Sequence, residues 1–145
     1  MDPYNMIDFN KKKGFICDMD GVIYHGNRVL PGVAEFIQWL HDEDKEYLFL
    51  TNNSGYTPRE LHQKLERLGL DVSEEHFYTS ALATAAFLRD QAPGCSVFAI
   101  GEAGLLNALY DAGITMNDVN PDYVVVGEGR SYSLDTLTKA TNLVM

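Results

Sequence analysis

The sequence is poor in several features that mark particular classes of protein. Basic residues are in the minority, with 11 lysines and arginines against 21 aspartates and glutamates and a formal net charge of -10 at pH 7. Such a surface as a whole repels a nucleic-acid backbone. No apolar run approaches the roughly 18 residues that a membrane-spanning helix needs. We therefore expect neither a nucleic-acid partner nor a membrane anchor.

Cysteine is also scarce, because Cys17 and Cys95 are the only two in the chain and stand far apart. Residues 1–10 carry acidic and polar side chains and lack the apolar centre of a secretion signal. A disulfide scaffold is therefore not expected, and the pattern favours a reducing, cytoplasmic setting.

What the chain does contain is typical of a globular protein. Its 145 residues are 46% hydrophobic and 22% charged, without a low-complexity tract, and this length can bury a sizeable core. We interpret the basic run at 11–13 as a solvated approach to the first strand, not as a targeting patch.

An apolar run ending in two aspartates is the first candidate for chemistry. Phe15-Ile16-Cys17 leads into Asp18, Met19 and Asp20, and then Gly21. A buried strand of a parallel sheet has this pattern where it leaves the core. Residues two apart on a strand share a face, so both carboxylates would project from the carboxyl end, where open α/β sheets bind ligands. Carboxylates this close favour a cation between them, and Mg²⁺ is the usual one.

A second polar group follows the next predicted strand. The short apolar run 47–50 stops at Thr51-Asn52-Asn53-Ser54-Gly55. The helix after it is marked by Thr57 as N-cap, Pro58 at the first position, Glu60 closing a capping box, and Gly69 at its end.

Strands and helices alternate through the rest of the chain. We predict a hairpin over 22–30 with its turn at Gly26-Asn27, strands at 77–79, 97–100 and 123–126, and helices over 31–44, 81–90, 103–112 and 133–145. Alternation of this kind indicates an α/β fold with a parallel sheet and right-handed crossovers. The Pro93-Gly94 break is the preferred domain boundary, dividing the chain into 1–92 and 93–145. Gly101 to Gly104 lacks the full glycine fingerprint of a dinucleotide site.

These groups together suit phosphoryl transfer. Asp18 would attack phosphorus and form an aspartyl-phosphate, while Asp20 would act as general acid and then base. The Thr51 hydroxyl and the Asn52 backbone N–H would bind the phosphate oxygens, and Mg²⁺ would sit on the Asp18 carboxylate and the Asp20 carbonyl. Taken separately, each group is also explained by a capped turn or a polar loop.

At these residues the sequence resembles the haloacid-dehalogenase-like (HAD) phosphatases. Residues 15–22 match the first motif of that superfamily, and Leu48 to Thr51 match the second. The stretches Asp-Gly-Val, Thr-Asn-Asn-Ser, Phe-Tyr-Thr-Ser-Ala and Val-Asn-Pro-Asp-Tyr-Val-Val-Val-Gly-Glu resemble the NagD-like subgroup. This resemblance implies the N-terminal half of a three-layer, Rossmann-like parallel-sheet core, followed from about Val97 by the start of an α/β cap.

The resemblance also implies roles for single residues. It makes Asp18 the nucleophile, Asp20 the acid/base, and Gly21, Thr51, Asn52 and Asn53 the phosphate contacts, with Mg²⁺ on Asp18 and the Asp20 carbonyl. Small phosphomonoesters are the implied substrates, with nucleoside monophosphates leading.

Two parts of the family pattern are not matched. Its phosphate-neutralising lysine and its second acidic pair lie beyond position 145 in related chains, and Lys139 lacks the context of that lysine. We therefore expect the chain alone to be a poor catalyst or inactive. The strand that carries Asp18 should expose an unpaired hydrophobic edge, which is a site for self-association.

Alternative functions stay open at this point. A receiver-like switch would accept a phosphoryl group on Asp18 without turnover, a phosphomutase would retain it, and a non-catalytic module would only bind a partner. The exact substrate and the oligomeric state, including a homo-oligomer, also stay open.

Overall fold

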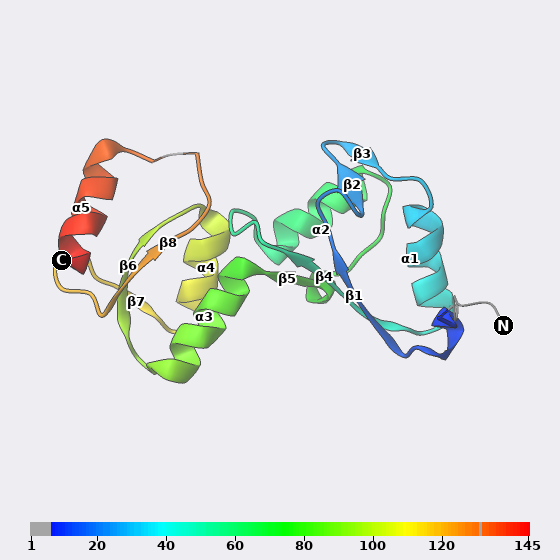
Figure 1. Ribbon diagram of the computed structural model, residues 1–145, viewed down its shortest axis with the longest axis horizontal. Coiled ribbons are helices and arrows are strands. Elements are labelled where there is room, and N and C mark those ends of the chain that lie inside the picture. The colour runs from blue at the N-terminus through cyan, green and yellow to red at the C-terminus, as the bar shows by residue number, and fades with distance from the viewer. Residues whose placement is uncertain (1–6, 131) are drawn as a thin grey trace.

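The computed structural model describes residues 7–130 and 132–145. Residues 1–6, part of the stretch expected to lack a secretion signal, and Ser131 lie outside the described residues. The chain forms two lobes, the first holding β1 to β5 with α1 and α2, and the second holding α3 to α5 with β6 to β8 (Figure 1). Among the described helices, none combines the length and hydropathy of a bilayer-crossing segment.

A parallel three-stranded sheet forms the centre of the first lobe, in the order β1-β4-β5. β1 is thus at the edge of the described sheet, which confirms the prediction of an unpaired side. The elements of this lobe are the short 3₁₀ helix η1 (Phe9–Lys11), β1 (Gly14–Asp18), β2 (Tyr24–His25), β3 (Arg28–Val29), α1 (Val33–Asp42), β4 (Glu46–Thr51), α2 (Pro58–Arg67), the 3₁₀ helix η2 (Glu74–His76) and β5 (Phe77–Thr79).

Helices cover one face of this sheet. Phe15, Tyr47, Phe49 and Phe77 point to the covered face and belong to one hydrophobic cluster with the apolar stripes of α1 and α2. On the other face Ile16 is paired with Leu48 and remains 72% exposed. Of the three layers expected, the described residues of this lobe therefore supply the sheet and one helical layer.

Local sequence signals fix the ends of α2. Thr57 accepts a hydrogen bond from the Glu60 N–H at 3.1 Å, and the Glu60 carboxylate accepts one from the Thr57 N–H at 2.8 Å. Pro58 begins the helix, and Gly69 ends it with a left-handed φ of 83°. The predicted capping box is confirmed.

Two other predicted helix starts were wrong by a residue or two. Gly32, with φ of 85°, is the N-cap of α1, so Pro31 precedes the first turn instead of lying in it. Helix α3 is capped by Thr79, whose hydroxyl accepts from the Leu82 N–H, and Ser80 is its first residue. The Ser80 hydroxyl is engaged elsewhere, since it donates to the Asn52 carbonyl at 2.8 Å.

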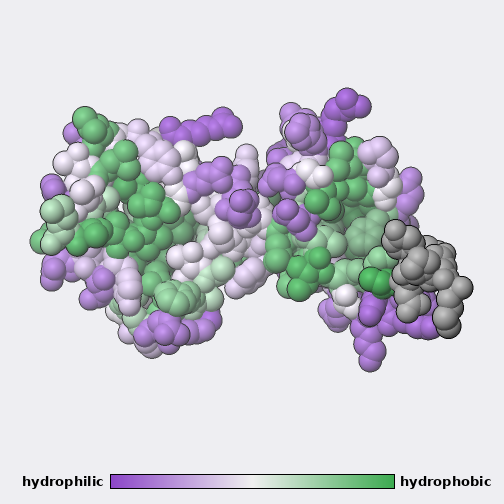
Figure 2. Space-filling model, viewed as in Figure 1, coloured by the Kyte–Doolittle hydropathy of each residue, from purple (hydrophilic) through white to green (hydrophobic). Residues whose placement is uncertain are grey.

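The second lobe contains its own parallel sheet, in the order β7-β6-β8. Its elements are α3 (Ser80–Gln91), β6 (Ser96–Ile100), α4 (Ala103–Asp111), β7 (Thr115–Met116), β8 (Tyr123–Val126) and α5 (Leu134–Val144). The short, exposed β7 was not predicted. Figure 2 shows hydrophobic surface on both lobes and hydrophilic residues gathered where the lobes meet.

The position of α3 bears on the domain boundary. Its buried residues Ala81, Ala85 and Leu88 belong to a second hydrophobic cluster with residues of β6 and α4, not to the cluster of the first sheet. The break at Pro93-Gly94 therefore has residues of the second cluster on both sides of it in the sequence. We propose that the two units divide near Thr79, where β5 leads directly into α3.

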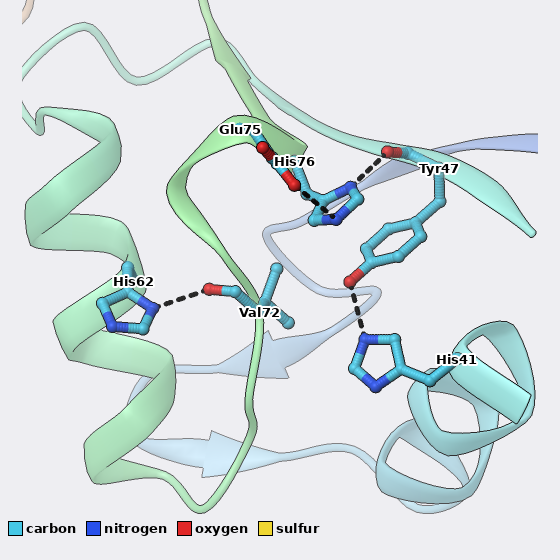
Figure 3. A network of polar contacts seen from close by, with 6 residues as sticks. All are labelled: His41, Tyr47, His62, Val72, Glu75 and His76. Carbon is cyan, nitrogen blue, oxygen red and sulfur yellow. Dashed lines mark hydrogen bonds and ion pairs between the residues drawn. The ribbon is translucent and has the colours of Figure 1, made fainter. Parts of the chain in front are cut away.

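A polar network of histidines stabilises the amino end of the first sheet (Figure 3). The Tyr47 hydroxyl and the His41 Nε2 are 2.9 Å apart, and the His76 ring stacks on Tyr47 with centroids 3.8 Å apart. His76 Nδ1 lies 2.9 Å from the Tyr47 carbonyl, and His62 Nδ1 lies 2.7 Å from the Val72 carbonyl. Because Tyr47 is the second residue of β4 and Thr51 is the last, this network lies at the opposite end of the strand from the candidate site.

The buried Tyr47 predicts a pH dependence of stability. Burial, followed by the charges of Asp71 and Glu75, raises the pKa of Tyr47 from 10.0 to about 12. A pKa raised on folding adds stability below the unfolded-state value and loses it as pH rises to the folded-state value. Between pH 10 and 12 the free energy of unfolding should therefore fall about 2 kcal/mol further in the native chain than in Tyr47→Phe.

Urea unfolding at a series of pH values measures this difference. The exposed Tyr110 provides a matched control, because Tyr110→Phe should retain the full pH dependence of the native chain. Parallel pH profiles for the native chain and Tyr47→Phe would contradict the prediction.

Candidate active site

The parallel pairing of β1 and β4 brings the two predicted polar groups to one end of the sheet. Asp18 is opposite Leu50 in the register, so Asp18 and Thr51 both lie at the carboxyl ends of adjacent strands. The side chains of Asp18 and Thr51 point to opposite faces of the sheet. Asp18 follows Ile16 on the open face, whereas Thr51 follows Tyr47 and Phe49 on the covered face and is only 6% exposed.

The chain turns sharply just after β1. The Val22 and Ile23 N–H groups both donate to the Met19 carbonyl, and the Gly21 N–H donates to the Tyr24 carbonyl at 2.8 Å. Met19 is fully buried, and Gly21 adopts a left-handed φ of 77°. Asp20 therefore lies in the turn just beyond the end of β1, and it is exposed like Asp18, whereas Met19 between them is buried.

This turn carries Asp20 to Thr51. The Thr51 hydroxyl donates to Asp20 Oδ2 at 3.4 Å, a contact between residues 31 positions apart in the chain. Asp18 Oδ1 accepts a hydrogen bond from the adjacent Met19 N–H at 2.8 Å. Both carboxylates are exposed, so the site is open to solvent and to a ligand.

The loop after β4 is held by hydrogen bonds of its own. Thr51 Oγ1 accepts from the Asn53 N–H at 3.1 Å, and Asn53 Oδ1 accepts from the Gly55 N–H at 2.7 Å. The Asn53 side chain thus shapes the loop. Asn52 is exposed beside it. The structure therefore brings Asp20, Thr51 and Asn53 into one connected group, with Asp18, Gly21 and Asn52 adjacent to it in sequence.

Tyr24 is a contact of Asp20 that the sequence reasoning missed. It is buried in the hairpin of β2 and β3, an antiparallel pair whose turn at Gly26-Asn27 was predicted. Burial, followed by the charge of Asp20 and its hydrogen bond to Asp20, raises the pKa of Tyr24 to about 12. The Lys64 Nζ lies 4.1 Å from the Tyr24 ring centroid. The Gly26-Asn27 turn signal between two short β-prone runs predicted the hairpin but not which of its side chains meets Asp20.

The donor set at this sheet end suits a hard cation in part. Mg²⁺ is commonly bound by one or two carboxylates together with water and substrate phosphate oxygens. Asp18 and Asp20 supply two exposed carboxylates at the site. The described residues contain no cluster of three or more histidine, cysteine or acidic side chains that could hold a metal alone.

A cleft lies beside this site, between the two lobes. It has a volume of about 520 Å³ and is lined on one side by Asn53 and Tyr56 and on the other by Glu102, Glu128 and Arg130. The cleft therefore begins at the loop that follows Thr51.

Known proteins resemble this chain over most of its length. A family model described as haloacid dehalogenase-like hydrolase matches residues 15–115. The ribonucleotide monophosphatase NagD of Escherichia coli K12 is 46% identical over 132 residues, which are 91% of this chain and 52% of that protein. A dihydroxyacetone phosphatase of Corynebacterium glutamicum is 44% identical over 131 residues, covering 90% of this chain and 48% of that protein.

Solved structures show the same similarity. The structure of NagD from E. coli K-12 matches with a TM-score of 0.86 and 45% identity, over 91% of this chain and 52% of that one. A 4-nitrophenylphosphatase from Thermotoga maritima matches with a TM-score of 0.87 and 32% identity, over 94% and 52%. The chain spans about half the length of the curated relatives it matches.

The fold and the matched family agree on a class of protein: a hydrolase with an α/β core. The chain belongs to the haloacid dehalogenase-like hydrolases. The predicted resemblance and its NagD-like subgroup are confirmed.

The turn between Asp20 and the hairpin yields a stability prediction. An added Cβ at Gly21 would meet no atom within 4 Å, so Gly21→Ala introduces backbone strain alone, from its φ of 77°. We expect this substitution to lower the free energy of unfolding by about 1 to 2 kcal/mol.

Gly14→Ala in β1 is the matched control, because its Cβ would make an ordinary 3.5 Å contact with the Glu46 carbonyl. The control should change stability by less than about 0.5 kcal/mol. Thermal or urea unfolding measures both variants, and equal losses would show that the left-handed turn is not required.

Proposed function

We propose that this chain supplies the nucleophile half of a Mg²⁺-dependent phosphomonoester hydrolase that works through an aspartyl-phosphate. The contact between Thr51 and Asp20 supports this function most directly. It brings a carboxylate of the first motif and the hydroxyl of the second motif within 3.4 Å at the end of the sheet where α/β folds bind ligands.

Each residue has a role that follows from its chemistry. The exposed Asp18 carboxylate attacks phosphorus, forming a P–O bond to the aspartate as the bond to the leaving oxygen breaks. Asp20 gives a proton to that leaving oxygen. It then removes a proton from the water that attacks the aspartyl-phosphate, which releases inorganic phosphate and restores Asp18.

Thr51 and Asn52 of the second motif bind the charged oxygens of the phosphoryl group. In the free chain the single Thr51 proton is directed at Asp20. With phosphate present, the hydroxyl turns to a phosphate oxygen, and the exposed Asn52 N–H binds another. Gly21 lets the backbone of the turn approach the ligand, and Asn53 keeps the loop in shape through its bond to Gly55.

Mg²⁺ would be held by the Asp18 carboxylate and the Asp20 carbonyl, with water completing its shell. It would offset the repulsion between an anionic nucleophile and an anionic substrate. The exposure of both aspartates leaves room for the ion and the phosphate together.

The substrates proposed are small phosphate esters. The relatives are named ribonucleotide monophosphatase, dihydroxyacetone phosphatase and acid sugar phosphatase, so nucleoside monophosphates are one candidate among several. We place the activity in a reducing, cytoplasmic setting, consistent with Cys17 and Cys95 both being free thiols. No nucleic-acid or membrane partner is proposed, and self-association along β1 is left to measurement.

Hydrolysis of p-nitrophenyl phosphate tests the function. It is measured with Mg²⁺ for the 145-residue chain and for a fusion of this chain to the C-terminal half of the E. coli relative. We expect the fusion to hydrolyse p-nitrophenyl phosphate. The chain alone should be slower by about a hundredfold or more, because the family's phosphate-neutralising lysine and second acidic pair are unmatched in it.

Asp18→Asn in the fusion should lower the rate by about a thousandfold or more, since it removes the nucleophile. Asp90→Asn, at an exposed position of α3, is the matched control and should leave the rate unchanged. Equal rates for Asp18→Asn and the native fusion would contradict the role of Asp18. A stable phosphoryl label on Asp18 without turnover would favour a receiver-like switch instead.

A further inference from the structure

The loop after β4 is bound on one side by the second lobe. Three elements that are far apart in sequence each place a hydrogen bond on this loop, which we call the phosphate loop and define as residues 51–55. Ser80, at the start of α3, donates to the Asn52 carbonyl at 2.8 Å. The Glu128 N–H, after β8, donates to Ser54 Oγ at 2.8 Å, and the Gly104 N–H of α4 donates to the Gly55 carbonyl at 3.1 Å.

Ser54 is at the centre of this contact. Its side chain is in the polar run of the second motif, yet it is only 5% exposed. Among the described residues, the Ser54 side chain makes no hydrogen bond to Asp18 or Asp20. Its hydroxyl instead accepts a hydrogen bond from the Glu128 N–H, 74 positions further along the chain. Because buried polar groups are normally hydrogen-bonded, the position of the Ser54 side chain depends on this contact with the second lobe.

Glycines allow the two lobes to approach this closely. A Cβ on Gly104 would lie 2.5 Å from the carbonyl oxygens of Ser54 and Tyr56, which are backbone atoms that cannot move aside alone. A Cβ on Gly127 would lie 2.8 Å from Ser54 Oγ. Gly104 therefore serves the packing of α4 against the loop, which gives this glycine a structural reason without a dinucleotide.

We infer that Ser54 is a positioning residue, through which the second lobe sets the conformation of the phosphate loop and the width of the cleft beside it. The loop is continuous from this contact to Thr51, through Asn53, which bonds to both Thr51 and Gly55. A shift of the second lobe would thus be transmitted to Thr51 and Asn52. The role in phosphate binding rests on the proposed function, whereas the docking of the lobes does not.

Amide hydrogen exchange measures the docking directly, because the Glu128 and Gly104 N–H groups bond across the lobes. In Ser54→Ala the protection of the Glu128 amide should fall roughly tenfold, since its acceptor is removed. Gly104→Ala should lower it further, because its Cβ forces the lobes apart. Amides within the β6 and β8 pair should keep their protection in both variants.

Matched controls separate docking from general destabilisation. Ser73→Ala removes an exposed hydroxyl that makes no capping bond, and Asn107→Ala changes an exposed position of α4. Both should match the native chain. Unchanged Glu128 protection in Ser54→Ala would overturn the inference, as would an equal loss throughout β6 and β8, which would mean that Ser54 stabilises the whole fold.

A phosphate titration tests the positioning role. Inorganic phosphate is added with Mg²⁺ while the amide shifts of Asn52 and Asn53 are followed by NMR. Ser54→Ala should weaken phosphate binding by about three- to tenfold, and Ser73→Ala should not. Reduced Glu128 protection with unchanged phosphate affinity would overturn the positioning role. Absence of phosphate binding to the native chain would count against the proposed site but leave the docking result standing.

Discussion

The parallel pairing of β1 with β4 is the constraint on which the site depends. With Gly14 opposite Glu46 and Asp18 opposite Leu50, both strands run in the same direction and end together. An antiparallel pairing of the same strands would put the aspartates and Thr51 at opposite edges. The parallel register is maintained from the covered face, where Phe15, Tyr47 and Phe49 pack against α1 and α2. Core packing on one face thus determines the chemistry at one end.

The two ends of this sheet have different properties. At the amino end, Tyr47 stacks on His76 and bonds to His41, so its polar groups are satisfied within the protein (Figure 3). At the carboxyl end, Asp18 and Asp20 are exposed, and Asp20 accepts a hydrogen bond from the Thr51 hydroxyl. The amino end stabilises the fold, and the carboxyl end is left available for a ligand.

Local signals in the sequence were sufficient for most of the elements. The capping box of Thr57 and Glu60 and the Gly26-Asn27 turn act over a few residues, so their patterns predicted the structure directly. The assignment of α3 could not be predicted in this way, because the alanine-rich helix 80–91 shows no strong apolar stripe that would indicate its partner. Its allocation depends on contacts with α4 and β6 that form only in the folded chain.

The site shows the same division. The spacing of Asp18 and Asp20 and the Thr51-Asn52 pair were visible as motifs, and the family resemblance gave them roles. The Ser54 contact with Glu128 was not visible, because it joins residues 74 positions apart through tertiary packing. The turn after β1 and the contact of Tyr24 with Asp20 are local, but the residue pattern did not show which side chain would meet Asp20. Gly104 was visible in the sequence as part of an incomplete glycine motif. A glycine is needed there because α4 approaches the backbone of the loop closely, and not because of a ligand.

The binding of Mn²⁺, as a paramagnetic substitute for Mg²⁺, tests the central claim most directly. The claim is that Asp18, Asp20 and Thr51 surround a single site for a divalent ion and a phosphate. NMR line broadening by Mn²⁺ in the presence of phosphate should appear first at the amides of 18–21 and 51–53 and leave those of Tyr47 and His76 sharp. Broadening that instead begins at the acidic cleft residues Glu60, Glu102 and Glu128 would contradict the account.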